Sequence, residues 1–199
     1  MKIALYGGAF DPVHNGHIAV VDFIHNLNYF DEIWILPSEH HKYDKTMSSF
    51  DDRVNMCKLS FEEYENVYVK SIEQFIYQTK LSDGSTYDLI RYLKEIYSEN
   101  EFYFIIGEDN AQSINQWKES EKLREMLRFI TLPRGSSDRN LVGAWYKEKP
   151  NIFLYDFEKH DISSSQIRSS IELNLPWSSS VNPKVFNYIQ KEGMYVDGW

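Results

Sequence analysis

Short runs of apolar residues recur along the chain and alternate with stretches whose apolar positions follow helical spacing. The runs have the length of strands, and their unbroken apolarity indicates burial on both faces of a sheet. They cover residues 3–6, 33–36, 102–106, 129–132 and 152–155. Strands that alternate with helices predict an α/β fold, namely a Rossmann-like parallel sheet with helices on both faces and right-handed crossovers.

Helical spacing predicts four helices between and after these strands. Their apolar stripes run through residues 18–27, 54–61, 89–96 and 183–193. Ser48 or Ser49 is the expected N-cap of the second helix, and Ser85 precedes the third. We expect residues 1–199 to form a single domain with a small helical C-terminal part from about residue 163, because 199 residues suffice for one substantial core.

Charge and composition narrow the class of protein. A net charge of −9 argues against a general affinity for nucleic acid or anionic membranes, so a polyphosphate ligand would need a local cluster of donors and a divalent cation. The chain shows no basic-then-apolar leader and no apolar run near the ~20 residues that span a bilayer, and we expect a cytoplasmic protein. Its single cysteine, Cys57, falls in an apolar helical pattern, which predicts a buried, inert thiol.

The stretch between the first strand and the first helix carries the densest chemistry. Its sequence is GGAFDPVHNGH, at residues 7–17. The paired glycines Gly7 and Gly8 let backbone amides approach an anion, and a helix that begins near Gly16 directs unpaired N–H groups at the same point. His14 and His17 can both face that point, where imidazole N–H groups would stabilise charge on a phosphoryl group in transit.

Other interpretations of this stretch stay open at this point. Glycine pairs end many strands, and two histidines three residues apart also occur as ordinary surface polarity. A zinc site is weaker, because no third ligand has a helpful spacing and metalloprotease helices space their histidines differently. A dinucleotide-binding loop is disfavoured because the pattern Gly-x-Gly-x-x-Gly does not occur here.

A second motif, ISSSQIR at residues 162–168, lies near the C-terminus. Its serines would cap a helix whose amides, with Arg168 one turn inside, bind polyphosphate; a plain N-cap is the alternative. In this order, the two motifs resemble the His-x-Gly-His and Ile-Ser-Ser-Thr-x-x-Arg signatures of the nucleotidyltransferase superfamily, which implies the nucleotidyltransferase fold. The resemblance assigns catalysis to His14, His17 and Arg168. It assigns ATP and phosphate binding to Gly7, Gly8, Ala9, Phe10, Gly16, Ile162, Ser163 and Ser164.

Further stretches are similar to nicotinate (or nicotinamide) mononucleotide adenylyltransferases, and the similarity covers nearly the whole chain. They are residues 50–56, 84–88, 104–110 with Trp117, and 183–195. The resemblance implies an enzyme of NAD biosynthesis that condenses ATP with nicotinate mononucleotide, giving nicotinate adenine dinucleotide and pyrophosphate. It implies Mg²⁺ held mainly by ATP, and small molecules rather than nucleic acid or membrane as partners. A nicotinamide mononucleotide enzyme and a non-catalytic nucleotide sensor are the alternatives, and assembly into a homo-oligomer stays open.

The same resemblance implies further binding residues. Gly107 and Asp109 belong to the family's Gly-x-Asp element, whose aspartate holds a nucleotide ribose, and Lys42 or Lys45 would close over the phosphates. For the pyridine mononucleotide, the implied residues are Thr86, Tyr87, Trp117 and Arg134.

The chain departs from the family pattern near the pyridine pocket and the phosphates. Ala9 stands where the family usually has Thr or Ser, and Leu89 and Ile90 occupy the region of a second threonine. Arg134 is only a loose match to a basic loop. These departures leave the preference between nicotinate and nicotinamide open. Pantetheine-phosphate adenylyltransferases fit less well, because they usually carry threonine where His14 stands.

Overall fold

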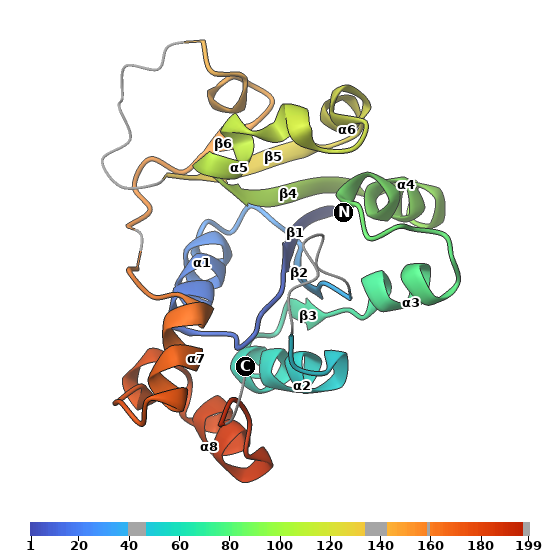
Figure 1. Ribbon diagram of the computed structural model, residues 1–199. Coiled ribbons are helices and arrows are strands. Elements are labelled where there is room, and N and C mark those ends of the chain that lie inside the picture. Colours follow the sequence, from blue (N-terminus) through green and yellow to red (C-terminus); the bar gives the residue numbers. More distant parts are fainter. Residues whose placement is uncertain (40–46, 134–142, 159, 197–199) are drawn as a thin grey trace.

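A parallel β-sheet forms the centre of the molecule (Figure 1). The structure, a computed structural model, describes residues 1–39, 47–133, 143–158 and 160–196. Within these ranges the sheet has six strands in the order β3-β2-β1-β4-β5-β6. They are β1 (Lys2–Gly8), β2 (Glu32–Pro37), β3 (Val67–Val69), β4 (Glu101–Gly107), β5 (Arg128–Leu132) and β6 (Ile152–Phe153). The strand order reverses between β1 and β4, so a ligand crevice is expected at the carboxyl ends of these two strands.

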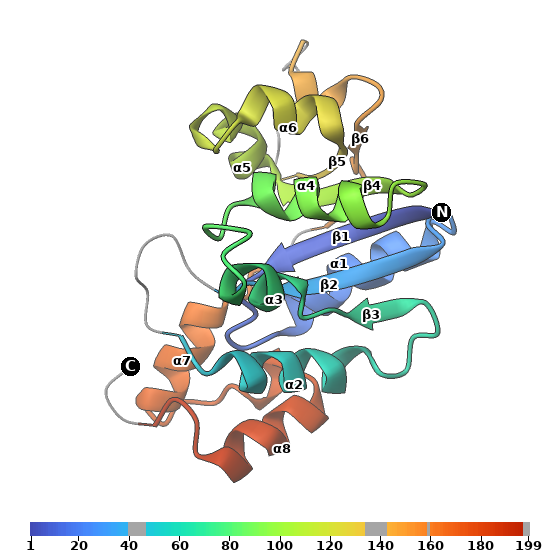
Figure 2. The same cartoon turned by 90° about the vertical axis from the view of Figure 1, so that its right-hand side faces the viewer.

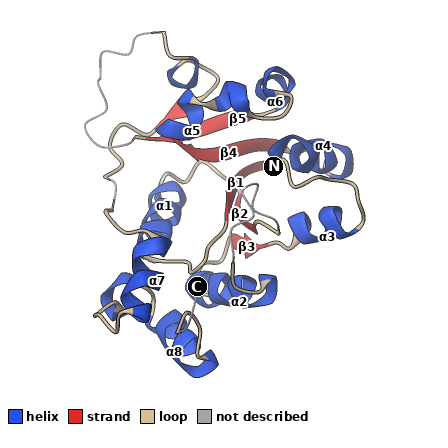
Figure 3. Cartoon of the chain, in the orientation of Figure 1, coloured by secondary structure: helices blue, strands red, loops and turns tan. Residues whose placement is uncertain are grey.

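Helices cover both faces of the sheet, as the alternation of elements predicts (Figures 2 and 3). On one face the core includes residues of α1 (Asn15–Asn26), α2 (Phe50–Phe61), α7 (Ser164–Glu172) and α8 (Pro183–Glu192). On the other it includes residues of α3 (Ile72–Gln78), α4 (Thr86–Ile96), α5 (Glu108–Gln112) and α6 (Ser120–Met126). Short 3₁₀ turns complete the chain at η1 (Ile114–Gln116), η2 (Trp145–Lys147) and η3 (Ser178–Ser180).

The two faces of the sheet explain why its strands read as unbroken apolar runs. In β1, Ala4 packs into the core on the α1 side, whereas Ile3 and Leu5 pack into the core on the α4 side. In β4, Tyr103 and Phe104 divide in the same way. Successive side chains of a strand point to opposite faces, so a strand covered on both sides needs apolar residues at every position.

The helix ends agree with the capping signals. Ser49 is the N-cap of α2, and its side chain accepts a hydrogen bond from the N–H of Asp52. Ser85 caps α4 in the same way. The last helix ends at Gly193, whose φ of 60° is the left-handed conformation that favours glycine. Cys57 lies fully buried in α2, as predicted, and burial raises the pKa of its thiol.

Two strands differ from the sequence-based expectation. The strand predicted over 152–155 is limited to Ile152–Phe153, because the chain turns immediately afterwards and the N–H of Tyr155 bonds back to the carbonyl of Phe153. The short strand β3 was not predicted, since three residues give too little pattern to recognise. Among the described residues, no helix has the length and apolarity needed to traverse a bilayer.

The C-terminal helices pack on the α1 and α2 side of the sheet (Figure 1). The hydroxyl of Tyr188 in α8 donates to Asp52 in α2 at 2.7 Å, and Lys184 pairs with Glu62 and Glu63 at 2.6 and 2.8 Å. This packing brings α7, with the second motif at its start, to the loop that joins β1 to α1.

Candidate active site

The two histidines of the first motif cap the helix that they begin. His14 is the N-cap of α1, and its Nδ1 accepts a hydrogen bond from the N–H of Gly16 at 3.1 Å. His17 completes the cap in the other direction, because its Nδ1 accepts from the N–H of His14 at 3.2 Å. The rings stack with centroids 3.8 Å apart. This reciprocal pair is a capping box built from imidazoles instead of the usual hydroxyl and carboxylate.

The capping bonds also assign the protons of both rings. Because Nδ1 is an acceptor in His14 and in His17, the proton of each neutral imidazole is assigned to Nε2. Burial lowers the pKa of His14 to about 4. Burial, with repulsion from His14 in second place, lowers the pKa of His17 well below its usual value. Near neutral pH both rings are therefore uncharged, and each offers one Nε2–H as a hydrogen-bond donor.

Gly16 lies close against the His14 ring, and a side chain there would crowd it. A Cβ at this position would lie 3.0 Å from two atoms of the imidazole. That distance is tighter than ordinary van der Waals contact, so the ring would have to shift and its cap would weaken. The glycine of the His-x-Gly-His motif is thus explained by close approach.

The second motif lies at the start of α7 and is hydrogen-bonded to the loop that joins β1 to α1. Ser163 is the N-cap, and with Gln166 it forms a capping box. The hydroxyl of Ser164 donates to the carbonyl of Pro12 at 2.9 Å. Arg168 donates from its guanidinium to the carbonyl of Asp11 at 2.6 Å. The start of α7 is thereby fixed against the residues that precede His14.

The imidazoles and the start of α7 line the same cavity, which has a volume of about 440 Å³. Its walls come from β1, α1, the ends of β4 and β5, and the segment that leads into α7. The lining residues are Tyr6, His14, Gly16, His17, Val20, Gly107, Asp109, Leu132, Pro133, Phe157, His160, Ile162, Ser163, Ser164 and Ser165. Neutral donors, a helix N-terminus and an apolar wall in one cavity suit a nucleoside phosphate.

Asp109 is an exposed carboxylate on the rim of this cavity, in the first turn of α5. Gly107 provides its space, because a Cβ on Gly107 would lie 2.7 Å from Asp109 Oδ1. The N-cap of α5 is Gly107, so Asp109 does not cap this helix. The role that the resemblance implies for it, accepting hydrogen bonds from a ribose, stays a prediction.

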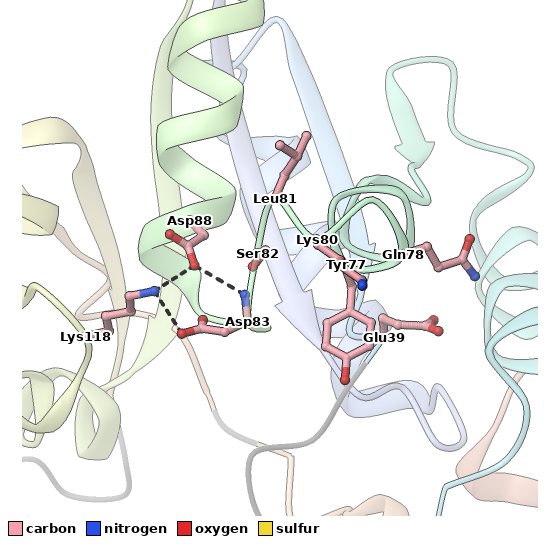
Figure 4. Close-up of a pocket in the computed structure, with 9 residues that line it drawn as sticks. All are labelled: Glu39, Tyr77, Gln78, Lys80, Leu81, Ser82, Asp83, Asp88 and Lys118. Carbon is pink, nitrogen blue, oxygen red and sulfur yellow. Dashed lines mark hydrogen bonds and ion pairs between the residues drawn. The ribbon is translucent and has the colours of Figure 1, made fainter.

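A second cavity, of about 650 Å³, lies at the start of α4 (Figure 4). Its lining residues are Glu39, Tyr77, Gln78, Lys80, Leu81, Ser82, Asp83, Asp88 and Lys118. Lys118 donates to Asp83 and to Asp88, both at 2.8 Å. Thr86 and Trp117 are close neighbours of these residues in the chain but do not line this cavity themselves.

Comparison with known proteins agrees with this geometry. The sequence model of the cytidylyltransferase-like family matches residues 5–170. A probable nicotinate-nucleotide adenylyltransferase of Fusobacterium nucleatum is 35% identical over 99% of this chain and 100% of its own. One of Caldicellulosiruptor bescii is 34% identical over 98% and 99%. The chain belongs to the nicotinate-nucleotide adenylyltransferase family.

A solved structure extends the likeness to the fold. Plasmodium falciparum nicotinic acid mononucleotide adenylyltransferase complexed with NaAD superposes with a TM-score of 0.79 at 29% identity, over 98% of this chain and 97% of that one. As a member of the nicotinate-nucleotide adenylyltransferase family, the chain is a nucleotidyltransferase with the fold that its sequence predicts.

Some residues that the adenylyltransferase resemblance implicates do not line the cavity that His14 and His17 line. Gly7 and Gly8 end β1 and pair with β2, and Phe10 is buried to 1% exposure against the ring of His17. None of the stretch from Gly7 to Phe10 is among the cavity's lining residues. Arg168 is not among them either, since its guanidinium is directed to the loop. The binding roles of these residues stay predictions.

The pyridine-binding predictions are placed only in part. Thr86 and Tyr87 begin α4, and Trp117 follows η1 with its ring 6.4 Å from that of Phe104. Tyr87 and Trp117 both pack partly buried against the core on the α4 side of the sheet. Lys42, Lys45 and Arg134 lie outside the described residues.

Several residues that line this cavity were not predicted from the sequence, among them His160, Leu132 and Phe157. His160 lines the cavity beside the two histidines, and its Cβ lies 3.8 Å from the position of a Cβ on Gly16. It stands two residues before the second motif, and that proximity was the available signal. The apolar wall of Leu132 and Phe157 was missed too, because each reads as part of a buried core.

Proposed function

We propose that this chain joins the adenylyl group of ATP to nicotinate mononucleotide, with release of pyrophosphate. The observation that carries the proposal is one cavity lined by two neutral imidazoles, the N-terminus of a helix and the Asp109 carboxylate. The names of the relatives support nicotinate as the substrate's pyridine. Because ATP and pyridine mononucleotides are cytoplasmic metabolites, we place the reaction in the cytoplasm.

In this reaction a 5′-phosphate oxygen of the mononucleotide attacks the α-phosphorus of ATP. The bond from that phosphorus to the bridging oxygen breaks, and pyrophosphate leaves with the bonding electrons. The attacking phosphate is already an anion near neutral pH, so the protein needs no general base and no covalent nucleophile. Its contributions are alignment of the two substrates and stabilisation of charge.

His14 and His17 supply the preorganised donors. Each ring is fixed by the hydrogen bond at its Nδ1, so its Nε2–H is directed without loss of side-chain freedom when the substrate arrives. In the proposal these two groups donate to the nonbridging oxygens of the α-phosphate, where charge grows as the new bond forms. An uncharged ring keeps its donor over the whole neutral pH range.

The start of α7 supplies the second phosphate contact. N–H groups in the first turn of a helix have no partner within the helix, and the helix dipole adds a partial positive charge. In the proposal Ser164, at the first position of α7, presents such an N–H group to the β- and γ-phosphates, while Ser163 beside it caps the helix and Asp109 accepts from the ribose of ATP. Arg168 holds the start of α7 against the first loop through its hydrogen bond to the carbonyl of Asp11.

The described residues include no group of three or more histidine, cysteine, aspartate or glutamate side chains that could hold a metal ion. Asp109 lines the cavity, and carboxylate oxygen is a ligand that Mg²⁺ accepts. Mg²⁺ prefers to keep several waters and to bind phosphate oxygens, so the residues present fit a cation carried in by ATP. Such a cation would neutralise part of the triphosphate charge.

The test is pyrophosphate release from ATP with each mononucleotide in turn. We expect release with nicotinate mononucleotide and a lower kcat/KM with nicotinamide mononucleotide. Release with neither, although ATP binds, would instead identify a nucleotide sensor. A higher kcat/KM with nicotinamide mononucleotide would keep the chemistry and reverse the choice of substrate.

A further inference from the structure

Asp11 is a carboxylate buried to 1% exposure three residues before His14. A buried charge is costly unless it is well bonded, so its contacts reveal what it is for. Its Oδ1 accepts a hydrogen bond from the hydroxyl of Tyr195 at 2.8 Å and from the N–H of Ser48 at 3.3 Å. The hydroxyl of Ser48 donates to the same oxygen.

The other carboxylate oxygen faces Arg168. Asp11 Oδ2 lies 3.9 Å from the Arg168 NH1 nitrogen, and it makes no hydrogen bond to any of the described residues. The same nitrogen donates to the main-chain carbonyl of Asp11 at 2.6 Å. Asp11 therefore holds the guanidinium through its carbonyl and by charge, while its Oδ1 is occupied on the opposite side.

Four segments that are distant in sequence meet at this carboxylate. Tyr195 follows α8, Ser48 precedes α2, Arg168 belongs to α7, and Asp11 belongs to the loop that leads to His14. Asp11 and Tyr195 are 184 residues apart. The loop that leads to the imidazoles is thus held by Tyr195, in the segment that follows α8.

We propose that Asp11 is a positioning residue of the adenylyltransferase site, and that the Tyr195 hydroxyl holds it in its working orientation. With Oδ1 bonded to Tyr195 and Ser48, the carboxylate cannot turn toward Arg168. Without the tyrosine hydroxyl only Ser48 holds Oδ1, so the carboxylate has more freedom to turn toward the guanidinium and to shift the loop that carries His14. The inference rests on the proposed function of that site.

The chain offers a matched control for this test. Tyr188 also lies in the C-terminal part. Its hydroxyl likewise donates a hydrogen bond to an aspartate, the partly buried Asp52 in α2, at 2.7 Å. That bond fastens α8 to α2 and involves no residue of the cavity. Tyr188→Phe and Tyr195→Phe each remove one tyrosine–aspartate hydrogen bond, and only the second reaches the imidazole loop.

The experiment compares kcat, KM and thermal unfolding of the two variants with those of the wild-type enzyme. We expect Tyr195→Phe to lower kcat about 10- to 100-fold with less than about a threefold change in either KM, because misplaced donors weaken the transition state more than the ground state. Tyr188→Phe should keep kcat within about twofold. Equal kcat values for the two variants at similar unfolding temperatures would overturn the proposal.

Two further measurements cover the remaining outcomes. If Tyr195→Phe fails to fold, Ser48→Ala removes another donor to the same carboxylate oxygen and should also lower kcat more than Tyr188→Phe does. If the wild-type protein makes no dinucleotide, the proposed function fails, and positioning is then read from the histidine NMR signals. The imidazole signals of His14 and His17 should shift in Tyr195→Phe and not in Tyr188→Phe; unchanged signals would refute the positioning role.

Discussion

The ammonium group of Lys118 lies 2.8 Å from the carboxylate of Asp88 and links two segments that the sequence associates with the pyridine (Figure 4). Asp88 stands two residues after Thr86 in the first turn of α4, and Lys118 directly follows Trp117. The link therefore joins the start of α4 to the segment after η1, which carry the predicted pyridine-binding residues Thr86 and Trp117.

Lys118→Met should raise the KM for the mononucleotide about three- to tenfold and leave the KM for ATP unchanged. The lysine side chain is 43% exposed, so the stability that its ion pairs confer is small, on the order of 1 kcal/mol. Lys122→Met is the control, because Lys122 pairs with Glu119 at 2.8 Å on the surface. Equal mononucleotide KM values in both variants would show that the Lys118–Asp88 ion pair does not affect mononucleotide binding.

His14→Asn and His17→Gln should separate the capping role of each histidine from its role in catalysis. Asparagine is a strong N-cap and glutamine suits the third helical position of a capping box, so α1 should stay intact. Each variant replaces the imidazole Nε2–H by a carboxamide N–H₂ group at a different position, so the preorganised donor is lost and kcat should fall roughly 100- to 1,000-fold. Pyrophosphate release and urea unfolding are measured together. Normal turnover in a well-folded His17→Gln variant would exclude its assigned role.

The stability of the wild-type protein should fall between pH 6.5 and pH 4. Burial lowers the pKa of His14 from 6.5 to about 4, so in this range the unfolded chain binds a proton that the folded protein does not. A contribution of about 3 kcal/mol that is fully present above pH 6.5 is therefore lost as the pH falls toward 4. His14→Asn removes this titration, and urea unfolding across the range should show a shallower slope. Equal slopes would contradict the pKa assignment.

Gly107→Ala should raise the KM for ATP about five- to tenfold. The new methyl group would approach Asp109 Oδ1 to 2.7 Å and displace the carboxylate, while the φ of −73° suits alanine. In an Asp109→Ala background the same change should have almost no further effect, because the displaced group is already absent. Additive effects in the double variant would show that Gly107 acts through something other than Asp109.

Much of the fold follows from local pattern. Strands β1, β2, β4 and β5 were predicted because burial on both faces makes every position apolar. The start of α2 was predicted to within one residue, at Ser48 or Ser49, and the end of α8 was predicted at Gly193, because capping is a local interaction. β3 and the helices α3, α5 and α6 are short, with three to seven residues each, and so gave no readable period.

The sequence indicated some of the residues that line the cavity, but not how they are arranged. The sequence places His14, His17 and Ser163 near the phosphates, and all three line one cavity. It could not show that His14 caps its own helix, since imidazole is not among the residues that usually signal a cap. The tie of Arg168 to Asp11 spans 157 residues and depends on tertiary packing that no local pattern encodes.

In the positioning proposal, the bond between Tyr195 and Asp11 makes full activity depend on a chain that extends at least to Tyr195. A chain that stops after α8 would still contain every residue that lines the cavity with His14 and would still be able to build the sheet. The loop that carries His14 would nevertheless lack the hydrogen bond that Tyr195 donates to Asp11. In the positioning proposal, synthesis would deliver a competent catalyst only after Tyr195 had emerged, and products that terminate before Tyr195 would turn over ATP slowly.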